Sequence, residues 1–272
     1  MNCSVCAPSE ADPAVVVAPY FDAHGRCLPA ELKAGVHRNT RRYFIVNQPA
    51  IDYAAIYRRS AKHLGSAQCP SEAEFEWRAS AILRELRDDP ATAPLLNGVG
   101  VPFLLPREAH TDVGEALQDV YLQAVSASFS EAFPHYAFTN HHQAGLAGKL
   151  SVVSGSRHDR LVEAMAHGPV VGYFFPCLTE YSVPAAIEQM ASLPDKFLLA
   201  GGYDTSAALV GSPDLLLRTD GYPPLLWLAA LQGESEQLGY HYEAYGYNLT
   251  FNRRPHFGRV AEYWSSGLVV LG

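Results

Sequence analysis

The stretch VVGYFFPCLTEYSVPAAIEQMASLPDKFLLA, residues 170–200, indicates how the chain folds. It contains two apolar runs, 170–175 and 197–200, that are typical of buried strands. Between them Ser182 precedes a helical pattern over residues 183–191, and a further helix is predicted over 157–166, after Ser156. Helix, strand, helix and strand in this order predict a layered α/β core with at least one parallel pair of strands.

Toward the N-terminus the pattern is mainly helical. Helices are predicted over residues 51–63, over 71–87 with the capping box Ser71 and Glu74, and from Thr111 as cap to just before Pro134. Short strands are expected at 14–17 and 43–46, within or next to an irregular arm of about 40 residues. The proline- and glycine-rich segment 88–106 is the best internal boundary.

Toward the C-terminus the pattern favours strands. Residues 225–230 fit a third core strand, followed by antiparallel strands within 240–251 and 260–271. The fold class expected is therefore α/β or α+β, with a mostly helical N-terminal part packed on a mixed sheet built mainly by the C-terminal half. Two units, 1–106 and 107–272, are expected, and a single domain stays open as the alternative.

Composition excludes several classes of protein. The chain has 272 residues and a formal net charge of −8, and its acidic excess is spread over both halves, so no basic lobe is available for nucleic acid. The longest apolar run, residues 224–231, is too short to cross a bilayer. Five cysteines argue against a disulfide framework. We therefore expect a cytoplasmic protein with a small-molecule substrate, no nucleic-acid or membrane partner, and an oligomeric state left open.

Polar side chains follow two of the predicted strands directly. Glu180 and Tyr181 come after the first strand, and Asp204 and Thr205 come after the second. Open α/β sheets bind ligands beyond the ends of their strands, and carboxylates there can act as acid and base. Both carboxylates can alternatively cap helices that start at Ser182 and Thr205.

A second candidate lies in GYHYEAYGYNLTF, residues 239–251. Strict alternation places His241, Glu243 and Tyr245 on one face of a strand. An imidazole and a carboxylate two residues apart can share a proton or bind a polar ligand. We expect this face to meet the ends of the core strands, so that Glu180, Asp204, His241 and Glu243 form one catalytic cleft, with Tyr181, Thr205 and Tyr245 binding substrate.

Three patterns suggest a divalent metal. His241, Glu243 and His256 have the residue types of a 2-His-1-carboxylate triad. His110-Thr111-Asp112 resembles the H-x-D motif of the iron and 2-oxoglutarate oxygenases, with His256 as the distal ligand that this resemblance implies. A structural zinc site is compatible with the spacing of four N-terminal residues: Cys3, Cys6, His24 and Cys27. Ordinary hydrogen-bonded or helix-capping roles remain the alternative for each pattern.

A loop in the middle of the chain suggests acyl-CoA. His141 and His142, which we also expect to bind substrate, precede QAGLAGKL, residues 143–150. The segment from His142 resembles the acyl-CoA-binding loop of the GCN5-related acetyltransferases. In that family backbone N–H groups at a helix N-terminus cradle a pyrophosphate, so the resemblance implies a transferase with an acyl-CoA donor. A tight structural turn is the alternative.

The leading functional hypothesis is thus an enzyme that acts on a small polar molecule by acid/base chemistry. The main alternative is a non-catalytic ligand-binding or protein-interaction module, because tyrosines are concentrated between residues 173 and 263 and aromatic side chains are favoured at recognition surfaces.

Overall fold

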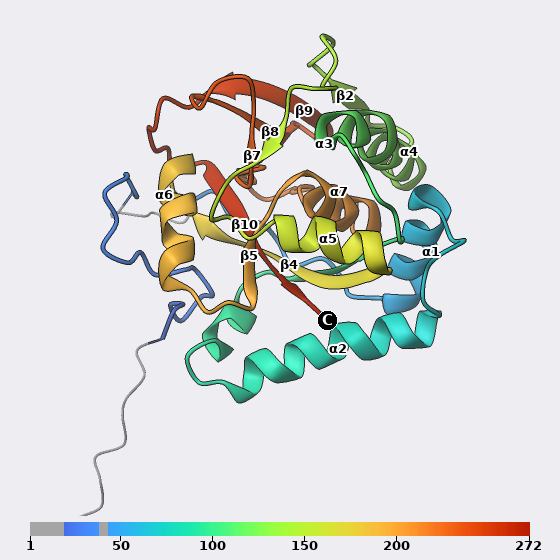
Figure 1. The fold of residues 1–272 in the computed structure, drawn as a ribbon, viewed down its shortest axis with the longest axis horizontal. Helices are drawn as coiled ribbons and strands as arrows, with labels where there is room; N and C mark the ends of the chain where they lie inside the picture. The colour runs from blue at the N-terminus through green and yellow to red at the C-terminus, as the bar shows by residue number, and fades with distance from the viewer. Residues whose placement is uncertain (1–18, 38–42) are drawn as a thin grey trace, which may run out of the picture.

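An eight-stranded mixed sheet forms the centre of the computed structural model, which describes residues 19–37 and 43–272 (Figure 1). Seven strands follow one another across the sheet in this order: β1 (Val101–Leu105), β4 (Val170–Thr179), β10 (Trp264–Leu271), β6 (Leu225–Trp227), β8 (Leu238–Tyr245), β9 (Asn248–Pro255) and β2 (Phe138–Asn140). The eighth strand, β5 (Phe197–Leu199), pairs with β10. A small second sheet joins β3 (Ser151–Val152) to β7 (Leu231–Gln232).

The C-terminal strand β10 connects the two halves of the sheet. One of its edges pairs with β4 along almost the whole strand, from the Ser265↔Thr179 pair to Leu271↔Gly172. The other edge pairs with β6 in parallel over residues 264–266 and with β5 in antiparallel over 268–270. The strands β4 and β5 therefore flank β10 and do not pair with each other, whereas β6 with β10 and β2 with β9 are parallel pairs.

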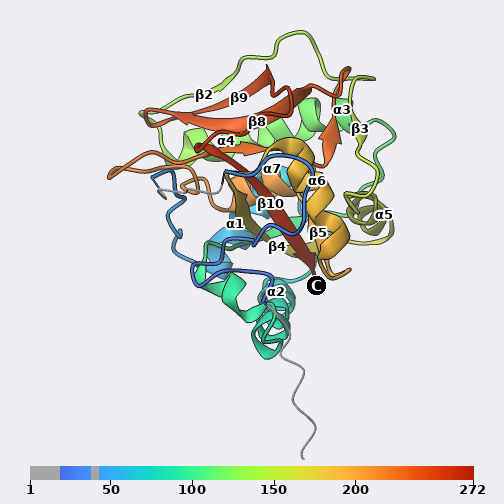
Figure 2. The ribbon, with the colours of Figure 1, turned by 90° about the vertical axis from the view of Figure 1, so that its left-hand side faces the viewer.

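Helices cover both faces of the sheet. They are α1 (Tyr53–Leu64), α2 (Glu72–Asp88), α3 (Val113–Ala116), α4 (Leu122–Ala132), α5 (Asp159–His167), α6 (Val183–Gln189) and α7 (Gly202–Gly211). A π-helical turn over Leu117–Tyr121 joins α3 to α4, and short 3₁₀ turns occupy Ala93–Asn97 and Met190–Ser192. Figures 1 and 2 place α2 at one end of the molecule and the β8–β9 hairpin at the other.

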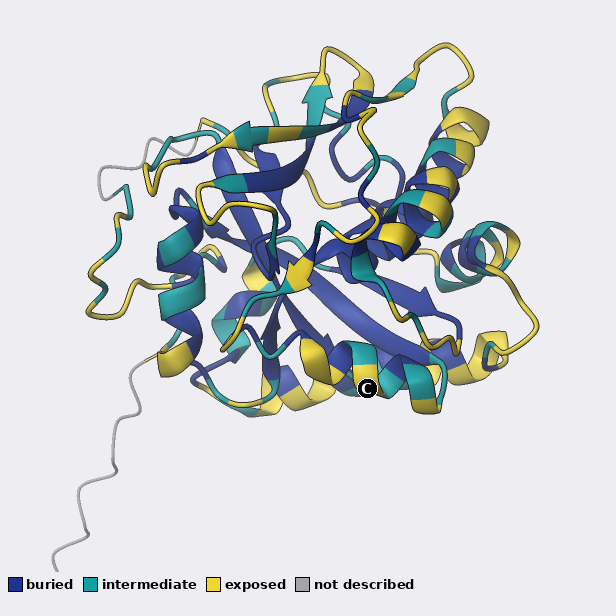
Figure 3. Ribbon diagram, turned by 45° about the horizontal axis from the view of Figure 1, so that its top comes forward, coloured by how far each residue is buried: buried dark blue, intermediate teal, exposed yellow. Residues whose placement is uncertain are grey.

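Alternation along the strands separates two apolar cores. On β4, Val170 and Phe174 belong to a core shared with α4, α5 and α7, whereas Tyr173 and Phe175 belong to a core shared with α2, α6 and the arm of residues 19–37. Successive strand side chains point to opposite faces, which explains the division. The central strands are buried and the outer faces of the helices are exposed (Figure 3).

The predicted fold class is confirmed, with the sheet mainly in the C-terminal half. The largest addition is β1, which lies in the segment predicted as a boundary and pairs with β4. The strand expected at 43–46 is wrong, because this segment is irregular and makes one isolated bridge, from Phe44 to Tyr222. The strand expected at 14–17 lies outside the described residues.

Two helix starts also differ from the prediction. The third predicted helix is capped by Asp112 rather than Thr111, since the Asp112 carboxylate accepts hydrogen bonds from the backbone N–H groups of Gly114 and Glu115. The helix expected to start at Thr205 starts three residues earlier, at Gly202. Within the described ranges no helix has the length and apolarity needed to cross a membrane.

Gly172 on β4 is required by close packing against β1. A Cβ atom at this position would overlap the ring of Phe103. We expect Gly172→Ala to lower the free energy of unfolding by about 1–3 kcal/mol, the usual cost of overpacking. Gly168→Ala is the matched control, because nothing lies within 4 Å of a Cβ there and the backbone is extended. Urea denaturation of the two variants measures the difference, and equal midpoints would contradict the packing argument.

Candidate functional site

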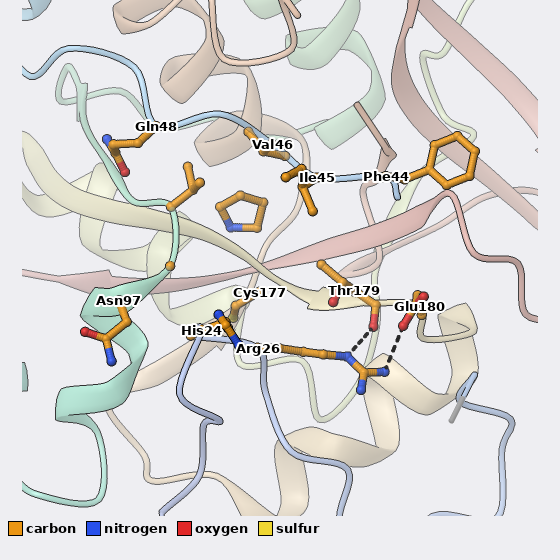
Figure 4. A pocket seen from close by; sticks show the side chains of 14 residues that line it. His24, Arg26, Phe44, Ile45, Val46, Gln48, Asn97, Cys177, Thr179 and Glu180 are labelled. Atoms are coloured by element: carbon orange, nitrogen blue, oxygen red, sulfur yellow. Dashed lines mark hydrogen bonds and ion pairs between the residues drawn. The ribbon is translucent and has the colours of Figure 1, made fainter. Parts of the chain in front are cut away.

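The described residues enclose a cavity of about 320 Å³ between the arm of residues 19–37, the segment 43–48 and the end of β4 (Figure 4). Its walls are largely apolar and include Phe44, Val46, Val99 and Pro176. Six polar residues also line it: His24, Arg26, Gln48, Asn97, Thr179 and Glu180. In Figure 4, Gln48 and Asn97 lie at one end of this cavity, whereas Phe44 and Glu180 lie at the other. A mostly apolar hollow with a few polar groups is typical of small-molecule sites. We call it the arm cavity.

Backbone hydrogen bonds hold the arm against β4. The Cys27 N–H donates to the Cys177 carbonyl at 2.9 Å, and the His37 N–H donates to the Glu180 carbonyl at 2.9 Å. The Tyr181 hydroxyl donates to the Cys27 carbonyl at 3.0 Å. The arm therefore forms one wall of the cavity although its sequence is irregular.

Glu180 has an unusual backbone conformation, with a φ of 65°. Its N–H donates to the Trp264 carbonyl of β10 at 2.7 Å, and its own carbonyl accepts from His37, so both neighbours fix this conformation. The left-handed region disfavours residues with a Cβ atom and costs about 1–2 kcal/mol for them. Such strain is concentrated at functional sites, and it here places a carboxylate at the cavity wall.

The Glu180 carboxylate is buried beside a guanidinium group. Arg26 Nη2 lies 3.4 Å from Glu180 Oε2, and both side chains are almost inaccessible. Oε2 makes no hydrogen bond with the described residues, so the contact is an ion pair without hydrogen-bond geometry. Arg26 is itself held by the carbonyls of Thr179 and His37, at 3.2 and 3.1 Å. A fixed positive charge thus compensates the buried negative one.

An imidazole and a second carboxylate continue this group toward solvent. His37 Nδ1 lies 3.9 Å from Glu180 Oε1, and His37 Nε2 lies 3.8 Å from Glu262 Oε1. The His37 and Glu262 side chains are each 31% exposed, in contrast to Glu180 at 6%. These distances are longer than hydrogen bonds, so the His37 ring lies close to both carboxylates without a hydrogen bond to either.

The cleft predicted from the strand ends is not formed, because its members lie on both faces of the sheet. Asp204 lies in the first turn of α7, next to the first core. Its Oδ1 accepts from the N–H groups of Gly201 and Thr205, and its Oδ2 lies 3.6 Å from His158 Nδ1. Both side chains of this ion pair are fully buried, and burial raises the pKa of Asp204. Thr205 is buried as well, and Tyr181 packs in the opposite core.

His241 and Glu243 form a separate group on the β8–β9 hairpin. His241 Nε2 lies 3.4 Å from Glu243 Oε2, which also lies 3.5 Å from Arg254 Nη2. Three inter-strand spacings separate β8 from β4, so this pair lies on the order of 14 Å from Glu180, too far for direct proton transfer. The ring of His241 packs on Trp227, and Tyr245 is 79% exposed at the hairpin turn.

The predicted metal sites are not assembled in the part of the chain that the structure describes. No three His, Cys, Asp or Glu side chains there come close enough to hold an ion. His256 Nδ1 accepts from the Gly258 N–H and does not join His241 and Glu243 as a ligand. In the His110-Thr111-Asp112 motif, Asp112 caps a helix. Cys3 and Cys6 of the proposed zinc set lie outside the described residues, whereas Cys27 is buried.

The loop after His142 does not have the geometry that the acetyltransferase resemblance implies. No helix follows it directly, because β3 comes next. Its N–H groups are used internally: Leu146 donates to Gln118 Oε1, and Gly148 donates to the Asp112 carboxylate. His142 is buried against Tyr240, and His141 is exposed. The Asp112 carboxylate lies where the resemblance implies a pyrophosphate, and two negative groups repel each other. This favours the alternative, a structural turn.

Comparisons of the chain with protein-family models, curated proteins and solved structures found no significant match. The functional argument therefore depends on the geometry of the site. Sequence reasoning identified Glu180 but missed Arg26, because nothing in an irregular arm signals a partner more than 150 residues away.

Because the backbone at Glu180 is strained, we expect a glycine variant at this position to be more stable than an alanine variant, the reverse of the usual order. Both Glu180→Ala and Glu180→Gly remove the carboxylate, but only glycine adopts a φ of 65° without steric cost. We expect the glycine variant to be more stable than the alanine variant by about 1–2 kcal/mol. At Thr179, which lies in β4, the same pair should show the opposite order. Chemical denaturation of the four variants measures both differences. Equal stability of Glu180→Ala and Glu180→Gly would contradict the strain argument.

His241 predicts a loss of stability in acid. Burial lowers the pKa of this imidazole, against the raising effect of Glu243. Below the ordinary pKa of about 6.5 the unfolded chain therefore binds more protons than the folded protein, so stability falls as the pH falls, by at most about 1.4 kcal/mol per pH unit for one proton. His110 and His256, whose pKa values burial also lowers, contribute in the same direction.

We expect His241→Gln to reduce the slope of stability against pH between 6.5 and 5, measured by denaturant titration at each pH. His141→Gln is the control, because His141 is exposed. A slope unchanged in His241→Gln would show that His241 is not titrating in this range.

Proposed function

We propose that the protein is an enzyme that binds a small, largely apolar molecule in the arm cavity and transfers a proton through Glu180. The observation that carries this proposal is a buried carboxylate, in a strained left-handed conformation, at the wall of a mostly apolar hollow. A buried carboxylate can accept a hydrogen bond or a proton from a bound donor without competition from water.

The surrounding groups define what a ligand must provide. Arg26 already compensates the charge of Glu180, so an additional ligand cation is not required. The carboxylate accepts hydrogen bonds and cannot donate them while ionised, so the ligand needs an N–H or O–H group facing it. The remaining walls favour an apolar body. A neutral compound with one donor group fits both conditions.

His37 supports proton transfer as well as binding. When Glu180 takes a proton from the ligand, the proton can pass to His37 and toward Glu262 at the surface. A proton that returns along the same groups is added to the ligand anion at a different atom, so the ligand isomerises and no other reactant is needed. Glu180 is then ionised again for the next cycle. Arg26 holds the carboxylate in place through this exchange.

The non-catalytic module remains the second candidate, supported by exposed tyrosines. Tyr43 contacts Tyr222, and separately Tyr136 contacts Tyr247, with ring centroids 5.9 and 5.2 Å apart. Among the described residues no ring contact joins these two pairs, so they support two small recognition surfaces rather than one large one.

Ligand binding tests the proposal directly. A panel of neutral compounds with an apolar body and an N–H or O–H donor is screened by thermal shift against the full chain. For compounds that bind, Glu180→Gln should weaken affinity about tenfold or more, because a hydrogen bond to a buried charge is lost. Val99→Phe, which fills the cavity, should have the same effect, whereas Glu76→Gln on the exposed face of α2 should have none.

Chemistry then separates an enzyme from a binding module. Bound compounds are incubated with the protein in D₂O and followed by NMR for conversion or for deuterium at carbon. Conversion that Glu180→Gln abolishes supports the proposal, and binding without any chemical change supports the non-catalytic alternative. Binding that is indifferent to Glu180→Gln and Val99→Phe would place the ligand elsewhere and overturn the proposed site.

A further inference from the structure

An aromatic row continues from the arm cavity onto the surface. Phe44 lines the cavity and contacts the rings of Tyr43, Tyr222 and Tyr263, with centroids 5.1, 6.4 and 5.8 Å away. Tyr43 and Tyr222 also contact each other, at 5.9 Å, with their planes inclined by 33°. We call Tyr43, Phe44, Tyr222 and Tyr263 the aromatic row.

Two members of the aromatic row are unusually exposed for large aromatic side chains. Tyr43 is 57% exposed and Tyr222 is 60% exposed. By contrast, Tyr240 and Tyr242, on strand β8, are fully buried. Burying an aromatic ring is favourable, so two neighbouring exposed rings at the edge of a cavity present surface that a ligand can cover.

The segment that carries Tyr43 and Phe44 is fixed rather than free. The Arg218 guanidinium donates to the Ile45 carbonyl at 2.9 Å, and Asn47 Nδ2 lies 3.5 Å from Asp220 Oδ1. Phe44 and Tyr222 additionally form a parallel bridge. These contacts hold the backbone that carries the rings, which reduces the entropy lost on binding.

Phe44 and Glu180 lie at the same end of the arm cavity in Figure 4. We propose that the ligand of the arm cavity is a neutral aromatic compound, whose N–H or O–H group is bound by Glu180 and whose ring stacks on Phe44 at the start of the aromatic row. This inference depends on the proposed function and specifies its class of substrate. Aromatic rings stack on one another in offset or tilted geometry, which saturated rings of the same size cannot do.

The test compares two neutral amides that differ only in their ring, benzamide and cyclohexanecarboxamide. Both present the same N–H donors to Glu180, and their affinities are measured by titration calorimetry or ligand-observed NMR. We expect the wild type to bind benzamide about threefold to tenfold more tightly, the range that aromatic pairing adds beyond burial. Phe44→Leu and Tyr222→Leu should reduce this preference toward one, whereas Tyr245→Leu, at the exposed hairpin turn, should leave it unchanged.

The outcomes separate this inference from the proposed function. Equal binding of the two amides by the wild type, with loss of both in Glu180→Gln, overturns the aromatic class and leaves the site intact. A benzamide preference that survives in both Phe44→Leu and Tyr222→Leu also overturns it, because the ring then lies elsewhere. If neither amide binds while other panel compounds bind through Glu180, only the inference fails. If no compound of the panel binds, both fail.

Discussion

The pairing of β10 with three strands is the constraint on which the rest of the structure depends. One edge of this last strand is occupied by β4, and the other edge is shared by β5 and β6 at different heights. β6 pairs with residues 264–266 of β10, and β5 pairs with residues 268–270. The helix α7, which follows β5, packs in the core on one face of the sheet, whereas Trp227 of β6 packs in the core on the other face. The carbonyl of Trp264, at the start of β10, also fixes Glu180 in its left-handed conformation. The same strand therefore closes the sheet and shapes the site.

Local patterns made much of this fold predictable. The apolar runs at 170–175 and 197–200, and Ser71 and Ser182 as helix caps, act over a few residues, and the structure contains the corresponding elements. The strand β1 was missed because Pro102 and flanking glycines suggest a loop, whereas its position at the edge of the sheet tolerates a proline. The order of strands was not predictable, since it depends on long-range pairing.

The candidate site was predictable only in part, for a related reason. Glu180 follows a clear strand, so its place at the end of a strand could be inferred from the sequence. Its partners could not be inferred, because Arg26 and His37 belong to an arm without periodicity that is ordered by hydrogen bonds to β4 and by the Tyr181 hydroxyl. The expectation that Asp204 would join them assumed that β4 and β5 are neighbours, and β10 lies between them.

The contrast among three carboxylate groups, those of Asp204, Glu243 and Glu180, explains why one of them is the better candidate for chemistry. Asp204 also has one oxygen, Oδ2, without a hydrogen bond, but it is fully buried with His158, receives two backbone hydrogen bonds and does not line the arm cavity. Glu243 is paired with both His241 and Arg254. Glu180 combines a strained backbone, a carboxylate oxygen without a hydrogen bond and a position at a cavity. Unfavourable features of this kind are concentrated at functional sites, and this is the physical reason for proposing the arm cavity as a ligand site.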